Sequence, residues 1–376
     1  MKSKIWLSPP HMGGMEERYL KDAFSTNWIA PLGPNVNGFE NDIAEYLGGQ
    51  LYVAALVSGT AALHIGLILL NTQPGDEIIC QSMTFSASAN AIRYVNATPV
   101  FVDSERDTWN MCPELLEKTI KDRISKGKKI KAIIPVHLYG MPARIKEIIE
   151  IAGRYNIPVL EDSAESLGSA VDNEKCGTFG DISILSFNGN KIITTSGGGA
   201  LVSHNIEYVN DTRFLASQAR DEAPHYQHSH IGYNYRLSNL CAGVGRGQME
   251  VLDERIRQKR FIYDFYYNKL KNLPGLTFLK EPKGYFSNRW LTTILIDPKV
   301  AGFNREELRI RFEAENIESR PLWKPMHLQP VFIDHPKYVN GVSESLFEHG
   351  LCLPSGTSLN NSDLERIADI VMSMYS

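Results

Sequence analysis

Two segments end in side chains that could act together in covalent chemistry. Residues 157–162 read Ile-Pro-Val-Leu-Glu-Asp, an apolar strand that ends in two acids. The next apolar stretch, residues 181–187, leads through Asn-Gly-Asn to Lys191. A lysine amine can form an imine with an aldehyde. A carboxylate such as that of Asp162 can pair with a protonated pyridine nitrogen and keep the ring an electron sink.

Each of these residues also has an ordinary explanation. Adjacent acids often cap a loop, and a single lysine after an apolar strand is usually solvated. Their combination favours a catalytic role over these ordinary explanations, because the carboxyl ends of strands form the usual ligand crevice of open α/β folds. Lys191 is also followed by a glycine-rich turn that ends at Gly199, where the backbone must pass close to something bulky.

A third segment is suited to binding a phosphate. Residues 57–63 read Val-Ser-Gly-Thr-Ala-Ala-Leu, a strand end, a turn of small residues and the start of a helix. Helix N-termini offer free N–H groups, so Gly59 and Thr60 are expected to donate to an anion, with hydroxyl donors from Thr60 and Ser186. Simple capping would explain the Ser-Gly-Thr sequence equally well. Phe85 could lie over a flat ring, although a phenylalanine in the core is the commoner arrangement.

The rest of the chain predicts an α/β fold that positions these residues. Short apolar runs alternate with amphipathic ones, as in a mostly parallel sheet of seven strands with helices on both faces. We expect strands at 52–57, 76–80, 98–102, 132–137, 159–162, 182–187 and 200–204, and helices at 60–70, 86–94, 113–125 and 143–155. A long charged helix over 252–270 and a last one near 362–375 indicate a smaller C-terminal α+β domain. The boundaries expected are 1–250 and 251–376, with 274–285 as a connection.

Composition excludes several classes of protein. The 376 residues are 43% hydrophobic and 22% charged with a net charge of −4, which is typical of a soluble globular chain and not of a nucleic-acid binder. The five scattered cysteines include no Cys-x-x-Cys pair and indicate neither a disulfide framework nor a zinc site. No apolar run is long enough for a membrane span, and the N-terminus does not resemble a secretory signal. A cytoplasmic location is expected.

The ordered motifs resemble those of the DegT/DnrJ/EryC1/StrS family of sugar aminotransferases, which have fold type I and use pyridoxal 5′-phosphate (PLP). The resemblance runs nearly end to end, through residues 7–14, 30–33, 58–63, 137–140, 161–162, 186–199, 232–236, 288–290, 320–327 and 353–356. It is greatest to the branch that aminates C4 of a UDP-2-acetamido-2,6-dideoxy-4-ketohexose on the route to bacillosamine-type sugars.

This resemblance implies a role for each matching residue. Lys191 would be the Schiff-base lysine and proton shuttle, and Asp162 would pair with the pyridine nitrogen. The other implied cofactor contacts are Phe85 on the ring, Gly59, Thr60 and Ser186 on the phosphate, and Asn234 on the phosphate from a second subunit of a homodimer. One departure is Glu165, because many members of the family carry Gln or His there. The C4 branch also tends to have Glu there, so the resemblance to that branch is retained, with Glu165 placed beside the cofactor oxygen.

Candidate substrate contacts come from the C-terminal half. An acidic protein must gather positive charge locally to bind a nucleotide diphosphate. Arg289 and Arg320 lie in motifs of the family and are preferred over Arg220, Arg236 and Lys324. Trp323 and His327 belong to the same motif as Arg320. The histidines of segment 225–230 suggest no metal site, because no cysteine or carboxylate set completes one; we expect an exposed or subunit-facing loop.

These residues and the resemblance together predict a PLP-dependent aminotransferase that moves an amino group from glutamate to C4 of the UDP-linked keto-sugar, with the gluco product favoured. Within enzymes, the alternative is a dTDP- or GDP-linked keto-sugar. A PLP-binding regulator without turnover is the alternative from another class, since fold alone does not imply function. Family members that remove a hydroxyl carry histidine in place of the lysine, so Lys191 favours transamination.

Overall fold

A twisted, mostly parallel sheet forms the centre of the larger part of the molecule. The structure is a computed structural model, and it describes residues 3–48 and 50–375. Bridges from Ile133 to Val159 and from Val136 to Asp162 join two four-stranded sheets edge to edge. The resulting strand order is β1 (Tyr52–Leu56), β9 (Gly199–Ser203), β8 (Ile182–Ser186), β5 (Leu160–Asp162), β4 (Ile130–Ile134), β2 (Glu77–Gln81) and β3 (Thr98–Val102), with the two-residue β14 (Lys337–Tyr338) beyond. Only β9 of these runs antiparallel to its neighbours, so the expected seven-stranded, mostly parallel sheet is confirmed.

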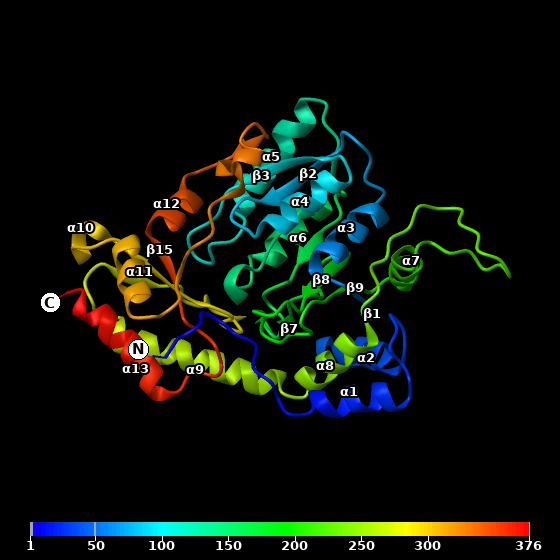
Figure 1. Ribbon diagram of the computed structural model, residues 1–376. Coiled ribbons are helices and arrows are strands. Elements are labelled where there is room, and N and C mark those ends of the chain that lie inside the picture. Colours follow the sequence, from blue (N-terminus) through cyan, green and yellow to red (C-terminus); the bar gives the residue numbers. More distant parts are fainter. Residues whose placement is uncertain (1–2, 49, 376) are drawn as a thin grey trace.

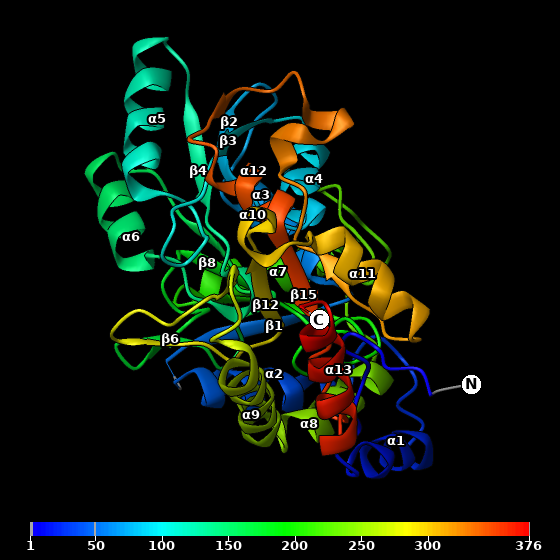
Figure 2. The ribbon, with the colours of Figure 1, turned by 90° about the vertical axis from the view of Figure 1, so that its left-hand side faces the viewer.

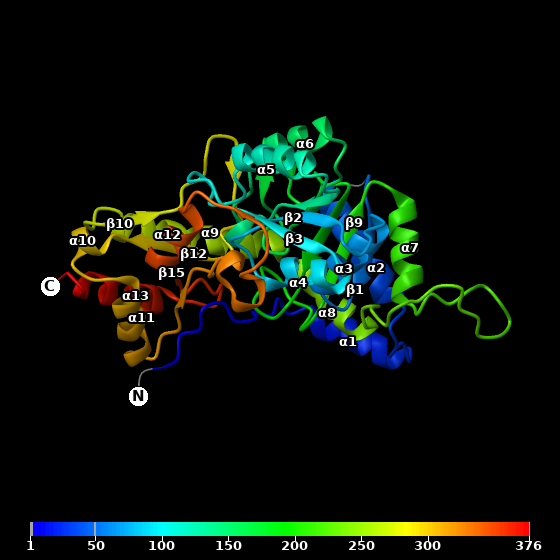
Figure 3. The ribbon, with the colours of Figure 1, turned by 90° about the horizontal axis from the view of Figure 1, so that it is seen from above.

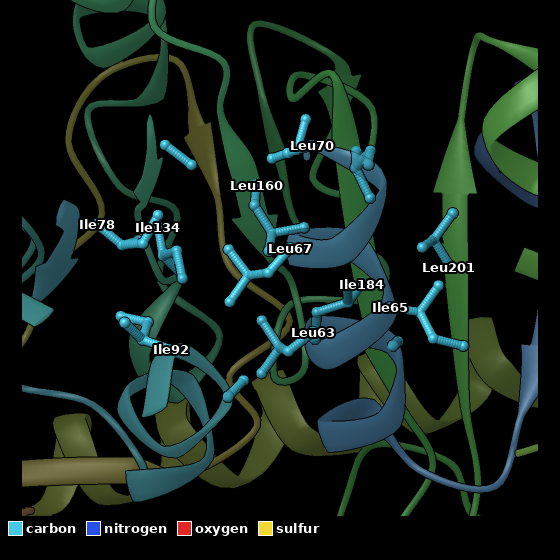
Figure 4. Close-up of a cluster of buried hydrophobic side chains, with 14 of the residues drawn as sticks. Leu63, Ile65, Leu67, Leu70, Ile78, Ile92, Ile134, Leu160, Ile184 and Leu201 are labelled. Carbon is cyan, nitrogen blue, oxygen red and sulfur yellow. The ribbon is translucent and has the colours of Figure 1, made fainter. Parts of the chain in front are cut away.

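The strands are apolar on both faces because helices cover both faces. Ile78 of β2 points into one cluster while its neighbour Ile79 points into another. The first cluster lies beneath α3 (Gly59–Leu69), α4 (Ser86–Tyr94) and α7 (Ile206–Ala216). Figure 4 shows Leu63 and Leu67 of α3 packed toward Leu160 and Ile184 of the sheet.

The opposite face is covered in two halves. Helices α5 (Pro113–Ser125) and α6 (Ile145–Arg154) pack on β2, β3 and β4. Figure 2 shows these two helices on one side of the strands and α4 on the other. The half around β1, β8 and β9 is covered by α2 (Pro34–Leu47) and α8 (Asn239–Met249), with α1 (Glu16–Ser25) lying against α8.

A smaller sheet gathers the C-terminal elements. Its order is β10 (Leu276–Phe278), β12 (Thr292–Ile296), β15 (Gly350–Leu353) and β13 (Arg320–Pro321), all antiparallel. Its core includes residues of α9 (Leu252–Leu270), α11 (Arg305–Ala314) and α13 (Asn361–Ser373). The short helices α10 (Pro298–Ala301) and α12 (Val342–His349) lie on the same side of the molecule (Figure 1).

Two features differ from the expected organisation. The segment 274–285 is not merely a connection: it contains β10, which pairs with β12. Ile5 belongs to the C-terminal cluster and bridges to Ile317, so the N-terminal residues run beside the smaller part before reaching α1. Division at residues 250 and 251 stays a proposal.

The remaining described elements are short or irregular. A three-stranded sheet contains β11 (Tyr285–Phe286), β6 (Ala170–Val171) and β7 (Glu174–Lys175). Single 3-10 turns occur at Leu138–Gly140, Met326–Leu328 and Pro330–Phe332. The segment between α7 and α8 extends away from the body as an arm (Figures 1 and 3). In the described part of the chain, no helix has the length and apolar character needed to cross a membrane.

Candidate active site

A cleft of about 710 Å³ lies beside the carboxyl ends of the parallel strands. The structure brings most of the residues predicted from the sequence into its lining: Gly59, Thr60, Phe85, Asp162, Glu165, Ser186, Lys191, Arg320 and Trp323. They come from elements on the sheet, from the loop after β8, and from β13 and the loop that follows it. Residues from both the large and the small part of the molecule therefore line the cleft.

Asp162 ends β5 and is held by donors on both carboxylate oxygens. Ser88 Oγ of α4 donates to Oδ2 at 2.7 Å, and the backbone N–H of Ala164 donates to Oδ1 at 3.1 Å. The side chain is 4% exposed, and this burial raises the pKa of Asp162. Burial disfavours the ionised form of a carboxylate that lines a cleft. A cation or a protonated ring nitrogen beside the carboxylate would stabilise that ionised form.

Lys191 lies on the loop after β8, close to a buried acid and an aromatic ring. Its Nζ is 3.2 Å from Glu165 Oε1 and 4.4 Å from the centre of the Trp290 ring. Glu165 Oε2 accepts from the backbone N–H of Tyr139 at 2.7 Å. Burial raises the pKa of Glu165, and the nearby Lys191 opposes that rise.

The N-terminus of α3 forms an anion cradle. Ser58 caps the helix by accepting from the N–H of Ala61 at 3.0 Å, which leaves the first N–H groups free to face the cleft. A Cβ at Gly59 would come within 3.0 Å of the Ser186 side chain, and one at Gly199 would come within 2.3 Å of the Gly59 nitrogen. These glycines allow β8, β9 and the start of α3 to approach one another closely at this end of the cleft.

Aromatic side chains form a wall of the cleft. Phe85 precedes α4 and remains 58% exposed, which is unusual for a phenylalanine beside a sheet. Its ring centre is 5.5 Å from that of Trp323. An exposed aromatic face in a cleft is suited to cover a flat ring.

A fully buried pair of side chains, Glu161 and His137, lies next to Asp162, because Glu161 precedes it in β5. Glu161 Oε1 lies 2.8 Å from His137 Nε2, and the carboxylate also accepts from the hydroxyls of Ser163 and Ser183. Three backbone N–H groups, of residues 177, 179 and 180, donate to it as well. Burial alone would raise the pKa of Glu161, but these hydrogen bonds outweigh it and hold the pKa at about 2. His137, Glu161 and Cys176 lie close enough together to hold a metal ion, but the Glu161 oxygens are already occupied by these donors.

Three predicted residues lie outside this cleft. Arg289 is buried, donates to the carbonyl of Leu279 at 2.8 Å and lies over the ring of Tyr263. His327 is 1% exposed and lies between Ser82 and Glu344. Asn234 is exposed at the base of the arm. The structure thus does not bring Arg289, His327 or Asn234 to the cleft of this chain.

Sequence reasoning missed several residues that shape the site. Ser88 holds Asp162, Tyr139 holds Glu165, and Trp290 lies beside Lys191. Tyr139 adopts a positive φ of 56°, which turns its backbone N–H toward Glu165. Trp290 and Tyr139 belong to the family motifs at residues 288–290 and 137–140. These motifs indicated that the two segments matter for the site, but they did not show which of their atoms would contact Lys191 or Glu165.

The residues present fit PLP. An amine for its aldehyde, an acid for its ring nitrogen, a glycine-lined helix start for its phosphate and an open aromatic face all line one cleft. When bound, PLP supplies an electron sink for the carbanion formed at the carbon that gives up or receives the amino group. Lys191 would hold it covalently, with Asp162 on its nitrogen and Gly59, Thr60 and Ser186 at its phosphate.

Fold and site define a PLP-dependent aminotransferase, and comparison with known proteins agrees. The chain belongs to the DegT/DnrJ/EryC1/StrS aminotransferase family, which it matches over residues 10–372. The resemblance, the enzyme class and the cofactor inferred from the sequence are confirmed.

Three relatives illustrate the match. The chain is 50% identical to "Putative pyridoxal phosphate-dependent aminotransferase EpsN" of Bacillus subtilis, over 100% of this chain and 97% of that protein. It is 38% identical to GDP-perosamine synthase of Escherichia coli O157:H7, over 98% and 97% of the two chains. The crystal structure of a DegT DnrJ EryC1 StrS aminotransferase from Brucella abortus superposes with a TM-score of 0.89 at 31% identity, over 96% and 95% of the chains.

Proposed function

We propose that this enzyme transfers an amino group from glutamate to C4 of a UDP-linked 2-acetamido-4-keto-6-deoxyhexose. The ketone oxygen is exchanged for the amino group of glutamate, which leaves as 2-oxoglutarate. The observation that carries the proposal is the convergence of Lys191, Asp162 and the α3 N-terminus in one cleft of about 710 Å³. The choice of C4 and of UDP is supported by the likeness of segments 7–14, 188–199 and 320–327 to that branch.

Lys191 is placed to move the proton in both halves of the reaction. It would take the proton from the glutamate α-carbon and return one to C4 of the sugar. The face of the sugar that its Nζ reaches therefore sets the configuration, and we propose the equatorial, gluco amine. Asp162 would remain ionised opposite the protonated ring nitrogen throughout.

The sugar nucleotide is proposed to enter past the rim of the cleft. Arg320 is largely exposed there, and its guanidinium pairs with Glu318 at 2.9 Å. A diphosphate would offer this arginine a second partner. Trp323 lies further in, with its backbone N–H donating to Tyr139 Oη at 2.9 Å. Roles for Arg289 and His327 in substrate binding remain proposals. Because both residues are buried outside the cleft, they would act by positioning neighbouring residues and not by direct contact.

A homodimer is proposed as the working unit, because Asn234 faces away from the cleft of its own chain. The arm that carries it also exposes Tyr226 at 79% and Ile231 at 87%, which a second copy would cover. A cytoplasmic location is part of the same proposal.

A GDP-linked keto-sugar is the second candidate, favoured by the 38% identity to GDP-perosamine synthase. The deciding experiment supplies glutamate with UDP-, GDP- and dTDP-linked 4-keto-6-deoxysugars and identifies the products by NMR. Amination of the UDP-sugar with a large H3–H4 coupling supports the proposal, and a small coupling indicates the axial epimer. Activity with the GDP- or dTDP-sugar alone overturns the choice of UDP.

A further inference from the structure

Lys259 of α9 is a buried lysine that the reaction described above does not use. Its side chain is only 2% exposed. Its Nζ donates to Ser8 Oγ at 3.0 Å and to the backbone carbonyl of Trp290 at 2.9 Å. Neither acceptor is charged, and no ion pair of Lys259 is found in the described part of the chain.

Such a lysine is costly to bury. An ammonium group in an apolar interior loses its hydration, and a carboxylate partner normally compensates for this. Here burial lowers the pKa of Lys259 to about 7. A methionine of similar length would fill the same space without that cost, but it would leave the Ser8 hydroxyl and the Trp290 carbonyl without this donor. The hydrogen bonds of Lys259 therefore fix the positions of these two groups.

Those hydrogen bonds lead to the residue before Lys191. Ser8 Oγ accepts from Lys259 and donates to the carbonyl of Asn190 at 3.1 Å. The same carbonyl accepts from Trp290 Nε1 at 2.7 Å. Lys259 therefore donates to both Ser8 and Trp290, and each of these residues donates to the Asn190 carbonyl. Together the four hydrogen bonds form a closed ring.

The set also touches Lys191 directly. The Trp290 ring centre lies 4.4 Å from Lys191 Nζ, so the residue that receives one Lys259 bond also contacts the reactive amine. Lys191 and Lys259 line a common small cavity with Ser8. The loop 188–191 is in neither a helix nor a strand, and such a loop needs side-chain contacts to hold one conformation.

We propose that Lys259 is a positioning residue for Lys191, acting through Ser8 and Trp290 on the Asn190 carbonyl. It joins three separate parts of the chain: the N-terminal segment, the middle of α9 and the loop before β12. Docking of the C-terminal elements is thereby coupled to the position of the amine that binds the cofactor. Capture of PLP requires no sugar, so this proposal can be tested whether or not the substrate proposed above is correct.

The main test is Lys259→Met, which keeps a long apolar side chain and removes both hydrogen bonds. The matched control is Lys269→Met on the same helix, where the lysine is exposed and pairs with Glu365 at 2.8 Å. After removal of the cofactor, the rate at which each protein captures added PLP is followed by visible absorbance. We expect Lys259→Met to be slower by about tenfold, the effect of losing an ordering hydrogen bond, and Lys269→Met to match the wild type.

Two further readouts separate positioning from a structural role. The limiting rate of the half-reaction with glutamate, followed in a single turnover, should fall while the glutamate concentration for half-maximal rate changes little. The thermal midpoint should change little, because removal of a buried charge offsets the loss of two hydrogen bonds. Amide hydrogen exchange at residues 188–192 should speed up in the cofactor-free variant. Wild-type capture and wild-type exchange in Lys259→Met would overturn the proposal.

A second variant covers the case in which Lys259→Met does not fold. Ser8→Ala cuts the route from Lys259 through Ser8 to Asn190 and leaves Lys259 and its bond to the Trp290 carbonyl in place, and we expect slower capture of PLP from it as well. If both variants fold, Ser8→Ala and Lys259→Met should be strongly non-additive in capture rate, because they break the same set of hydrogen bonds. Additive effects, or wild-type capture by Ser8→Ala, would contradict action through Ser8.

Discussion

Lys191 Nζ and Glu165 Oε1 lie 3.2 Å apart, with the two side chains 10% and 2% exposed. The acid therefore holds the reactive amine in the cleft before any cofactor contact is made. It also ties the amine to the positive-φ turn at Tyr139, whose N–H binds the other carboxylate oxygen. Glu165 therefore links the Lys191 amine to the backbone of Tyr139. A glutamine could accept the hydrogen bond from Tyr139 but would lack the charge that attracts the amine.

Glu165→Gln is expected to keep the fold and the bond from Tyr139 but to lower kcat by about tenfold, because the charge-assisted contact with Lys191 becomes a neutral one. Steady-state kinetics with glutamate and a keto-sugar acceptor, together with the pH dependence of the visible absorbance of bound PLP, measure the effect. A variant with unchanged kcat and an unchanged absorbance profile would show that Glu165 serves packing alone.

Lys191→Ala should abolish turnover and leave the far-ultraviolet circular dichroism unchanged, because the side chain is needed as the covalent attachment and as the base. Borohydride reduction of the wild-type holoenzyme should fix the cofactor on Lys191, as read by peptide mass spectrometry. Label on another lysine would show that the assignment is wrong.

Asp162→Asn should reduce kcat by about 10²-fold or more, since a neutral amide no longer stabilises a protonated ring nitrogen.

Ser88→Ala removes one hydrogen-bond donor to Asp162 and should lower kcat by about tenfold. A larger effect in Ser88→Ala than in Asp162→Asn would be inconsistent with a role for the serine through the aspartate.

Asn234→Ala should weaken retention of PLP if the arm completes the phosphate site of a second copy. The measurement is cofactor loss during dialysis, alongside light scattering for mass. Arg220→Ala, in the same arm, is the control and should retain the cofactor. A fully active monomer would rule out the shared site.

Glu161→Gln should lower the free energy of unfolding in urea by about 3 kcal/mol, because removing one partner of a fully buried pair leaves His137 without its charged partner. The contribution of a carboxyl with a lowered pKa is complete above pH 4.5 and is lost as the pH falls toward 2. The variant should therefore lose less stability than the wild type across that window. The exposed Glu150→Gln should behave as the wild type throughout.

Local signals predicted several elements to the residue. The helices at 86–94 and 113–125 have the predicted bounds, the second because Pro113 occupies its first turn. The strand at 98–102 was also predicted correctly. Strand β10 was missed because three residues, Leu-Thr-Phe, between Pro274 and Pro282 carry too short a pattern to be distinguished from a connection.

The placement of side chains depended on long-range contacts that motifs do not encode. Arg289 and His327 lie in family motifs, yet one packs on Tyr263 and the other on Ser82. Their neighbours in the same motifs, Trp290 and Trp323, do line the cleft. Adjacent residues point in different directions, so a motif identifies a segment without showing which of its side chains faces the ligand.

The sequence by itself determined the class of this protein. An acid and a lysine at neighbouring strand ends and a small-residue helix start are compatible with the cofactor chemistry, because strand ends converge at one edge of a parallel sheet, and the resemblance of the ordered motifs to one family specified it. Only the tertiary structure decided how the reactive lysine is held. Lys259 is 68 residues from Lys191 in the chain, and Ser8 is 182 residues from Asn190. Contacts at such separations exist only after the two parts of the molecule have packed together, and no local pattern of residues records them.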